Sequence, residues 1–263
     1  MARITRFAPS PTGPLHLGHA YAALIAAERG DRFLIRIEDI DQTRCKPASE
    51  AAIYDDLHWL GLAWETPVLR QSTRTDAYQH ALDTLTERGL TYHCTCTRSD
   101  IRAALSAPQG PDGPIYPGLC RDKGHAEGAL RLNIARATAT LPDLGFTESG
   151  KLHRFNPRQL IQTTGDVILS RRDIGTAYHL AVVVDDAFQD ITEVTRGLDL
   201  LPATPLQVTL QHLLGLPAPA YHHHRLILDD QGKRLAKRDD ARALSTYRAE
   251  GATPQDIRHM VGL

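Results

Sequence analysis

Residues 6–20, RFAPSPTGPLHLGHA, join a short apolar segment to a longer one and are rich in residues that stiffen a backbone. The apolar run AYAALIAA follows from residue 20. A loop that leaves a strand and enters a helix directs backbone N–H groups and the positive end of the helix dipole toward one place. The stretch therefore predicts a strand, a rigid loop and a helix over about 18–29, with an anion site where they meet.

Two residue types in this loop suit a phosphate ligand. Gly13 and Gly18 allow the backbone to approach closely. His16 and His19 can donate hydrogen bonds to phosphate oxygens as charge builds in a transition state. On spacing alone, a rigid strand-to-helix turn with incidental histidines is an equally good interpretation.

Composition sets outer limits on function. The chain has 263 residues, of which 42% are hydrophobic and 23% charged, and its formal net charge is −1. No global field attracts it to nucleic acid, so a polyanion site must be a local basic patch. No apolar run approaches the ~18 residues of a membrane helix, and MARITRF lacks the apolar region of a signal peptide. Its four cysteines do not form a disulfide framework in a chain of this length, so we expect a cytoplasmic protein.

Strand and helix patterns alternate through most of the chain. A strand over 32–38 and helices from about Pro47 and over 75–88 predict an α/β fold with a parallel sheet. From Tyr92 to about Tyr178 the alternation stops, and turn residues and short strand patterns replace it. We therefore expect a Rossmann-like domain made of 1–92 and 178–263, with a smaller α+β subdomain inserted over 93–177.

Two segments carry a resemblance to a known family. His16–His19, HLGH, resembles the HIGH signature of class I aminoacyl-tRNA synthetases, and RLAKR over 234–238 resembles their KMSKS signature. The second match is degraded, because only its second lysine is kept, as Lys237. Taken alone, RLAKR is also typical of a solvated basic loop. The resemblance implies ATP with Mg²⁺ as cofactor, and His16, His19 and Lys237 as catalytic residues. It places ATP against Pro9, His16, Gly18, His19 and Lys237.

Further stretches indicate which amino acid is activated. RFAPSPTG is similar to the glutamyl branch of the family, as are RIEDID, YHLAVVVDDA and TRGLDLL. The glutaminyl branch usually has proline and glutamate where this chain has Ala8 and Ser10. An arginine fork binds a carboxylate bidentately, which suits the side chain of glutamate. The resemblance implies substrate contacts from Arg6 to the side-chain carboxylate, from Glu38 to the α-ammonium, and from Ala8, Ser10, Tyr178 and Arg196.

The inserted region contains HCTC and YPGLC, which place thiols at metal-binding spacing. Thiolates bind Zn²⁺ tetrahedrally, and a structural site needs four ligands, so three cysteines leave one position open. The spacing resembles the zinc site of a short paralogue of glutamyl-tRNA synthetase, in which tyrosine is the fourth ligand. The implied ligands of one structural zinc ion are Cys94, Cys96, Tyr116 and Cys120. His93 and His125 are alternatives to the tyrosine, because imidazole is the commoner ligand.

YHHHR, over 221–225, also suggests metal at first sight. Three adjacent histidines cannot all face one ion in an extended strand, so a structural or RNA-facing role is the better interpretation.

The chain ends 25 residues after Arg238, where full glutamyl-tRNA synthetases continue into a helical anticodon-binding part. The whole chain therefore resembles the short paralogues, the glutamyl-Q tRNA(Asp) synthetases, which attach glutamate to queuosine in the anticodon loop of tRNA(Asp). The implied activity is ATP-dependent activation of L-glutamate to glutamyl-adenylate and transfer to that base, by a monomer without an anticodon-binding domain. The alternatives are a truncated synthetase that charges a tRNA 3′ end, or an inactive tRNA- or glutamate-binding module.

Overall fold

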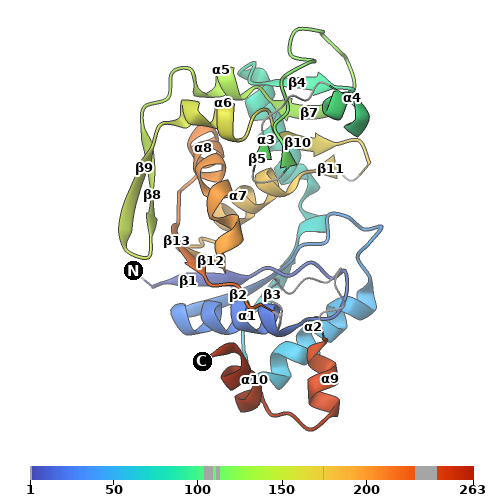
Figure 1. Ribbon diagram of the computed structural model, residues 1–263, viewed down its shortest axis with the longest axis vertical. Coiled ribbons are helices and arrows are strands. Elements are labelled where there is room, and N and C mark those ends of the chain that lie inside the picture. Colours follow the sequence, from blue (N-terminus) through green and yellow to red (C-terminus); the bar gives the residue numbers. More distant parts are fainter. Residues whose placement is uncertain (1, 104–108, 111–112, 174, 229–241) are drawn as a thin grey trace. The chain divides into compact units, whose positions relative to one another are not determined.

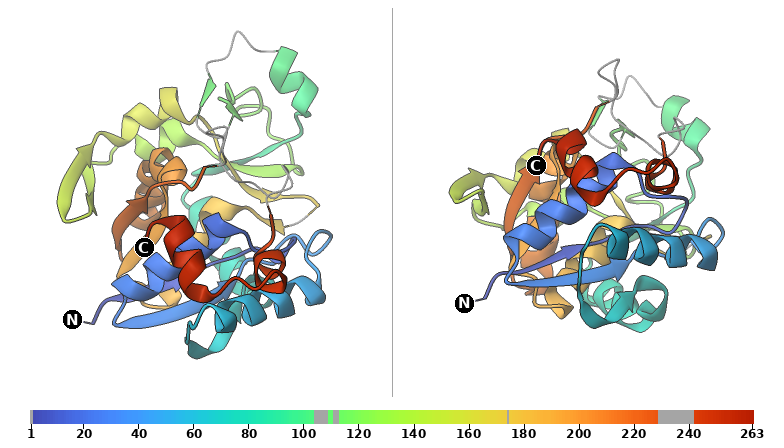
Figure 2. Two further views of the ribbon diagram at one scale, coloured as in Figure 1. Left: turned by 60° about the horizontal axis from the view of Figure 1, so that its bottom comes forward. Right: turned by 90° about the horizontal axis from the view of Figure 1, so that it is seen from below.

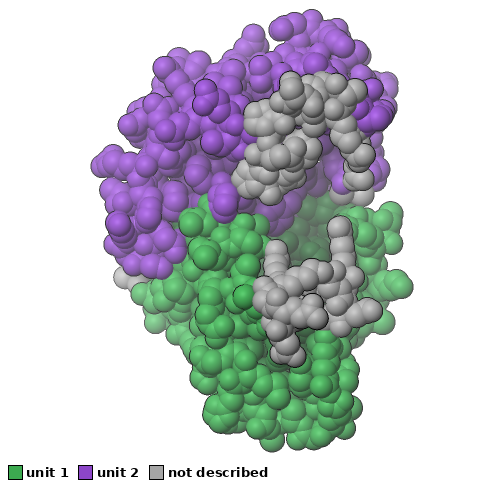
Figure 3. All heavy atoms as spheres, in the orientation of Figure 1, with its two compact units in different colours: residues 1–73, 190–201, 220–263 green, residues 74–189, 202–219 purple. Residues whose placement is uncertain are grey.

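The structure is a computed structural model that describes residues 2–103, 109–110, 113–173, 175–228 and 242–263. It divides into two compact units, which Figure 3 distinguishes by colour. Unit 1 comprises residues 1–73, 190–201 and 220–263, and unit 2 comprises residues 74–189 and 202–219.

Unit 1 is built on parallel strands (Figure 1). β1 (Ile4–Phe7) pairs with β2 (Arg32–Ile37), which pairs with β3 (Glu65–Arg70), and β12 (Glu193–Gly197) pairs with β13 (Ala220–His224). The N–H of Thr192, just before β12, donates to the carbonyl of Ile4 at 3.0 Å, and Arg6 reaches the carbonyl of Thr195. β12 therefore runs beside β1 in the same direction, and the strand order reverses between these two strands.

In the described part of unit 1, the α-helices are α1 (Leu17–Arg29), α2 (Pro47–Trp59), α9 (Leu244–Ala249) and α10 (Pro254–Val261). The red α10 lies along the blue α1 in Figure 2, and contacts between the two helices agree with this view. Their apolar faces bury one hydrophobic core, whose members include Leu24, Ile35, Leu57, Leu244 and Ile257. Each such side chain contributes roughly 1.5–3 kcal/mol when fully buried. Leu244 and Ile257 come from α9 and α10, so the C-terminal helices are part of this core.

Unit 2 has its own hydrophobic core and its own antiparallel sheet. The sheet contains β4 (Thr91–Cys94), β7 (Ala129–Leu132), β10 (Ile168–Arg171) and β11 (Gly175–Thr176), and β8 (Leu144–Glu148) and β9 (Lys151–Phe155) form a hairpin. A short strand pair, β5 (Gln109–Gly110) and β6 (Gly113–Pro114), is also antiparallel. The helices are α3 (Thr75–Glu87), α4 (Arg98–Ala103), α5 (Ile134–Thr138), α6 (Leu160–Thr163), α7 (Tyr178–Phe188) and α8 (Thr204–Leu214).

The predicted α/β class is confirmed, and the strong periodic patterns became elements close to the expected bounds. The compact units nevertheless divide the chain differently from the expected 93–177 insertion. Leu82 of α3, Leu180 of α7 and Leu210 of α8 are buried in one core with the strands of the insertion. β3 has no strand pattern in the sequence, because its residues are exposed or half-buried and include Pro67, which weakens such a pattern.

None of the helices in the described parts of the chain combines the length and the apolarity that crossing a bilayer requires.

Candidate functional site

His16 and His19 form a compact pair at the start of α1. His16 is the N-cap residue, and its Nδ1 accepts a hydrogen bond from the backbone N–H of Gly18 at 3.1 Å. Nδ1 of His19 accepts from the backbone N–H of His16 at 3.2 Å, which completes a reciprocal capping box. The two ring centroids are 3.8 Å apart. Both imidazoles are thus fixed at the positive end of the helix dipole.

This arrangement determines which ring nitrogen carries the proton. Because Nδ1 accepts in both rings, each neutral imidazole has its proton on Nε2. Two Nε2–H donors beside a helix N-terminus suit the oxygens of a phosphate. A Cβ at Gly18 would lie 3.0 Å from Cε1 of His16, so a larger residue there would press on the His16 ring.

Two backbone hydrogen bonds fix the loop before α1. The carbonyl of Pro9 accepts from the N–H of Glu38 at 3.0 Å, and the carbonyl of Pro11 accepts from the N–H of Lys46 at 3.1 Å. Both prolines are buried. The loop therefore joins the ends of β1 and β2 to the start of α2, and little backbone freedom remains to be lost when a ligand binds.

Arg6 lies on the face of the unit 1 sheet that points away from α1. The neighbouring Thr5 faces α1, because its hydroxyl donates to the carbonyl of Ala26 at 2.7 Å. Successive residues of a strand alternate between faces, so Arg6 is on the other one. The Arg6 side chain is buried, and its Nη1 donates to the carbonyl of Thr195 at 3.2 Å.

Arg196 lies on the same face as Arg6. Glu193 faces α1, since Nε of Arg29 donates to its carboxylate at 2.6 Å, and Arg196 is three residues further along β12. Arg196 is buried, and its Nε donates to Nε2 of His223 at 3.0 Å. Two buried guanidinium groups on neighbouring parallel strands create a positive region on this face, which suits a carboxylate.

The other predicted glutamate ligands are distributed over both units. Ala8 and Ser10 follow β1, and Glu38 follows β2, where its Oε1 lies 3.7 Å from Nη2 of Arg36. These positions are at the carboxyl ends of parallel strands, the edge where open α/β sheets bind ligands. Tyr178 is the first residue of α7 and belongs to unit 2. Lys237, with the rest of 234–238, lies outside the described residues.

The cysteines of unit 2 form a cluster around a tyrosine hydroxyl. Tyr116 Oη lies 3.3 Å from Sγ of Cys94 and 3.4 Å from Sγ of Cys96, and the Sγ atoms of Cys96 and Cys120 are 3.5 Å apart. All three thiols lie within 4.8 Å of one another. In a tetrahedral zinc site with Zn–S near 2.3 Å, ligand atoms are about 3.5–3.8 Å apart. The four side chains therefore fit one zinc ion.

The two histidine alternatives are placed less well. Among the described residues, the group with metal-binding spacing contains the three cysteines and no histidine. His93 precedes Cys94 in β4 and so points to the other face of the strand. Nε2 of His125 lies 3.4 Å from the hydroxyl of Thr95. The geometry favours Tyr116 as the fourth ligand.

The protonation of the cluster reflects its burial and hydrogen bonds. Burial opposes ionisation of Cys120, but hydrogen bonds from the Tyr116 hydroxyl and the Thr95 backbone outweigh it and lower the pKa of the thiol to about 6. Burial, followed by hydrogen bonds to the cysteines, raises the pKa of Tyr116 above its usual value. A bound cation would lower the pKa of both groups, since it stabilises thiolate and phenolate.

The Tyr116 ring of the cluster contacts an arginine that is hydrogen-bonded to the backbone of Asp166. Asp166 accepts two hydrogen bonds from Arg121, at 2.6 and 3.0 Å, and its backbone carbonyl accepts from Nη1 of Arg131 at 2.6 Å. The guanidinium of Arg131 lies 3.8 Å from the ring centroid of Tyr116. This network was not expected from the sequence, because no local pattern relates these residues.

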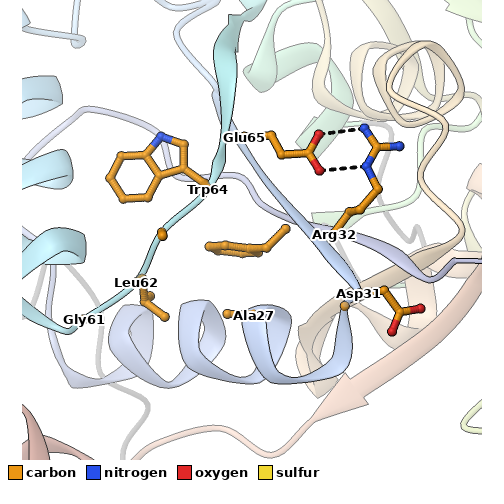
Figure 4. Close-up of a pocket in the computed structure, with 10 residues that line it drawn as sticks. Ala27, Asp31, Arg32, Gly61, Leu62, Trp64 and Glu65 are labelled. Carbon is orange, nitrogen blue, oxygen red and sulfur yellow. Dashed lines mark hydrogen bonds and ion pairs between the residues drawn. The ribbon is translucent and has the colours of Figure 1, made fainter.

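A recess of about 460 Å³ also occurs in unit 1 (Figure 4). Ala27 and Leu62 line it beside Trp64, and the ion pair between Arg32 and Glu65 lies at its edge. It is found where α1 ends and where β2 and β3 begin. The predicted site residues lie at the start of α1 and the ends of the strands, so this recess is not part of the candidate site.

Comparisons with known proteins agree with the fold and the motifs. Residues 3–124 and 154–263 match the family described as tRNA synthetases class I (E and Q), catalytic domain. The chain is 58% identical to a glutamyl-Q tRNA(Asp) synthetase from Rhodobacter capsulatus, over 99% of this chain and 100% of the relative. It is 44% identical to the protein of that name from Nocardia farcinica, over 96% of this chain and 81% of the relative.

A solved structure gives the same result at the level of the fold. The glutamate-tRNA synthetase from Elizabethkingia anophelis has a TM-score of 0.77 and 27% identity, and the match covers 100% of this chain and 61% of that one. The expected family resemblance is thereby confirmed. The chain belongs to the glutamyl-Q tRNA(Asp) synthetase family of enzymes and carries the catalytic domain of class I tRNA synthetases.

Proposed function

We propose that this enzyme activates L-glutamate with ATP, forming glutamyl-adenylate, and then transfers the glutamate to queuosine in the anticodon loop of tRNA(Asp). The family names supply the class of activity. The observation that carries the proposal is that Arg6 and Arg196 lie on one face of the sheet. Arg6 belongs to β1, the strand that leads into the loop with the capped histidine pair.

In the first step, the α-carboxylate of glutamate attacks the α-phosphorus of ATP and pyrophosphate leaves. The substrate is its own nucleophile, so no general base is needed. The protein contributes position and charge stabilisation, through the Nε2–H groups of His16 and His19 and through Lys237. Pro9 and Gly18 bring the backbone of the loop to the nucleotide. Bound Mg²⁺ would neutralise phosphate charge.

Recognition of glutamate depends on charge complementarity. Arg6 and Arg196 bind the side-chain carboxylate, and Glu38 receives the α-ammonium. Ser10 donates a hydrogen bond, and Ala8 and Tyr178 complete the set of contacts. The solved glutamate tRNA ligase of Elizabethkingia meningosepticum, described as a complex with its amino acid, is 27% identical, and this similarity supports glutamate as the substrate.

In the second step, a hydroxyl of queuosine attacks the carbonyl carbon of the adenylate, which gives an ester and releases AMP. The modified base must leave its stack to reach the adenylate. We further propose that Cys94, Cys96, Tyr116 and Cys120 hold one zinc ion with a structural role, since the site has no open position for a substrate.

The test is incubation with ATP, labelled glutamate and tRNA(Asp) that carries or lacks queuosine. We expect label on the queuosine-containing tRNA alone, and glutamate-dependent exchange of pyrophosphate into ATP. Label on both tRNAs at the 3′ end would identify a truncated glutamyl-tRNA synthetase instead. If no amino acid supported exchange of pyrophosphate into ATP, the protein would be an inactive binding module.

A further inference from the structure

Arg196 is held by two residues of the adjacent strand. In the parallel register, Arg196 of β12 is opposite His223 of β13. Its Nε donates to Nε2 of His223 at 3.0 Å, and its guanidinium carbon lies 5.2 Å from the ring centroid of Tyr221. The rings of Tyr221 and His223 are stacked, with centroids 5.9 Å apart and an interplanar angle of 6°. Arg196, Tyr221 and His223 are only 7%, 1% and 9% exposed.

The hydrogen bond defines the protonation of His223. Every guanidinium nitrogen is a donor, so Nε2 of His223 must be the acceptor. The imidazole is therefore neutral, with its proton on Nδ1. A residue without an acceptor at the Nε2 position could fill the space but could not orient the arginine.

Orientation matters because a guanidinium is flat. It binds a carboxylate through two parallel N–H bonds only when its plane contains the carboxylate. A bond at Nε fixes that plane, and the Tyr221 ring restricts motion perpendicular to it. We infer that His223 is a positioning residue, which sets the plane of Arg196 for the side-chain carboxylate of glutamate. This inference rests on the proposed role of Arg196 and adds a residue that determines specificity.

Two isosteric variants separate orientation from simple packing. In His223→Gln, the side-chain oxygen lies close to the position of Nε2 and can accept from Arg196. In His223→Asn, the oxygen corresponds to Nδ1 and is too short to reach. His222→Gln is the matched control, because residue 222 is in the same strand but on its other face.

The measurement is glutamate-dependent exchange of pyrophosphate into ATP. A hydrogen bond to a charged group is strong enough for its loss to raise the KM for glutamate about 10- to 100-fold, and we expect this for His223→Asn. The KM for ATP should stay within about threefold. We expect His223→Gln and His222→Gln to stay within about threefold of the unmodified enzyme for both substrates.

Each failure has a different meaning. If the unmodified enzyme shows no exchange with glutamate, the proposed function is wrong. If it is active and His223→Asn keeps a normal KM for glutamate, only the positioning role is wrong. Equal losses in His223→Asn and His223→Gln, for glutamate and ATP alike, would show a packing role and also overturn the inference. Thermal unfolding of each variant identifies any that fail to fold. If His223→Asn does not fold, comparison of His223→Gln with the unmodified enzyme still tests whether an acceptor near the position of Nε2 is sufficient.

Discussion

At the scale of single residues, His16 combines an observed structural function with a proposed chemical one. Its Nδ1 caps α1, and this bond places the proton of the neutral imidazole on Nε2, the atom proposed to donate to phosphate. The two functions make different demands on the side chain. Many residue types can cap a helix, whereas few can donate a hydrogen bond to phosphate. The two can therefore be separated by substitution.

His16→Asn tests this separation. Asparagine is among the best N-cap residues, so helix stability should change by less than about 1 kcal/mol. The Nε2 donor is lost, and we expect the rate of glutamate activation to fall about 10²- to 10³-fold. Pyrophosphate exchange and thermal unfolding of the same preparation measure the two effects. Normal exchange in a stable variant would show that the ring does not contact the reacting phosphate.

Asp56 predicts a dependence of stability on pH. Burial in α2 raises the pKa of this carboxyl to about 6, although Arg248 partly offsets the effect. Because the pKa is higher in the folded state than in the unfolded state, the contribution of Asp56 is fully present below about pH 4 and is lost as pH rises to about 6.

The corresponding variant is Asp56→Asn, which cannot ionise. At pH 7.5 it should be more stable than the unmodified protein by roughly 1–2 kcal/mol, and at pH 4 the difference should be close to zero. Denaturant unfolding at the two pH values measures both quantities. If the variant and the unmodified protein differed equally in free energy of unfolding at both pH values, the effect of the asparagine would not come from its lack of charge.

At the scale of elements, the β4 strand and the loop before Cys120 have few apolar side chains of their own. Their buried cluster consists of Cys94, Tyr116 and Cys120, with Cys96 partly buried beside it. A metal ion that binds the folded state stabilises it in proportion to the logarithm of its free concentration. A zinc ion held by the cluster would therefore stabilise this part of unit 2.

Tyr116→Phe measures the contribution of the fourth ligand. The ring and its contact with Arg131 remain, while the oxygen is lost. We expect zinc affinity to fall by about tenfold or more, as is typical when a metal site loses a coordinating or supporting group. Competition with a chromophoric chelator gives the affinity, and the absorption spectrum of the Co²⁺-loaded protein reports the ligand set. An unchanged spectrum and affinity would favour a histidine or water in that position.

At the scale of the whole molecule, each of the two compact units has a large hydrophobic core of its own. The predicted nucleotide and carboxylate contacts lie mainly in unit 1, and the metal cluster lies in unit 2. Ligands that bind only one folded unit should slow local opening there more than elsewhere.

Hydrogen exchange tests this division. A non-hydrolysable glutamyl-adenylate analogue should slow exchange at amides of residues 8–19 and 193–198 by about tenfold or more. Removal of zinc with a chelator should instead accelerate exchange at residues 92–96 and 115–121. Mass spectrometry of peptides covers both regions in one experiment. If the analogue protected the cysteine cluster as strongly as residues 8–19, the two sites would not be independent.

Local patterns of the sequence were sufficient for the elements and for the chemistry of the first loop. The prolines, glycines and histidines of residues 6–20 act within one turn of the backbone, so their spacing alone predicts a rigid loop and a helix start. The same holds for the Cys-x-Cys pair, because Cys94 ends β4 and Cys96 follows it by two residues.

Contacts between distant segments required the tertiary structure. Arg6 and Arg196 share a face only because β12 inserts beside β1, and the pairing of Arg196 with His223 follows from the register of β12 and β13. Likewise, the support of Tyr116 by Arg131 and Asp166 joins three separate segments of unit 2. Strand order and register are set by the burial of whole faces, which is a property of the assembled cores and not of any local stretch of residues.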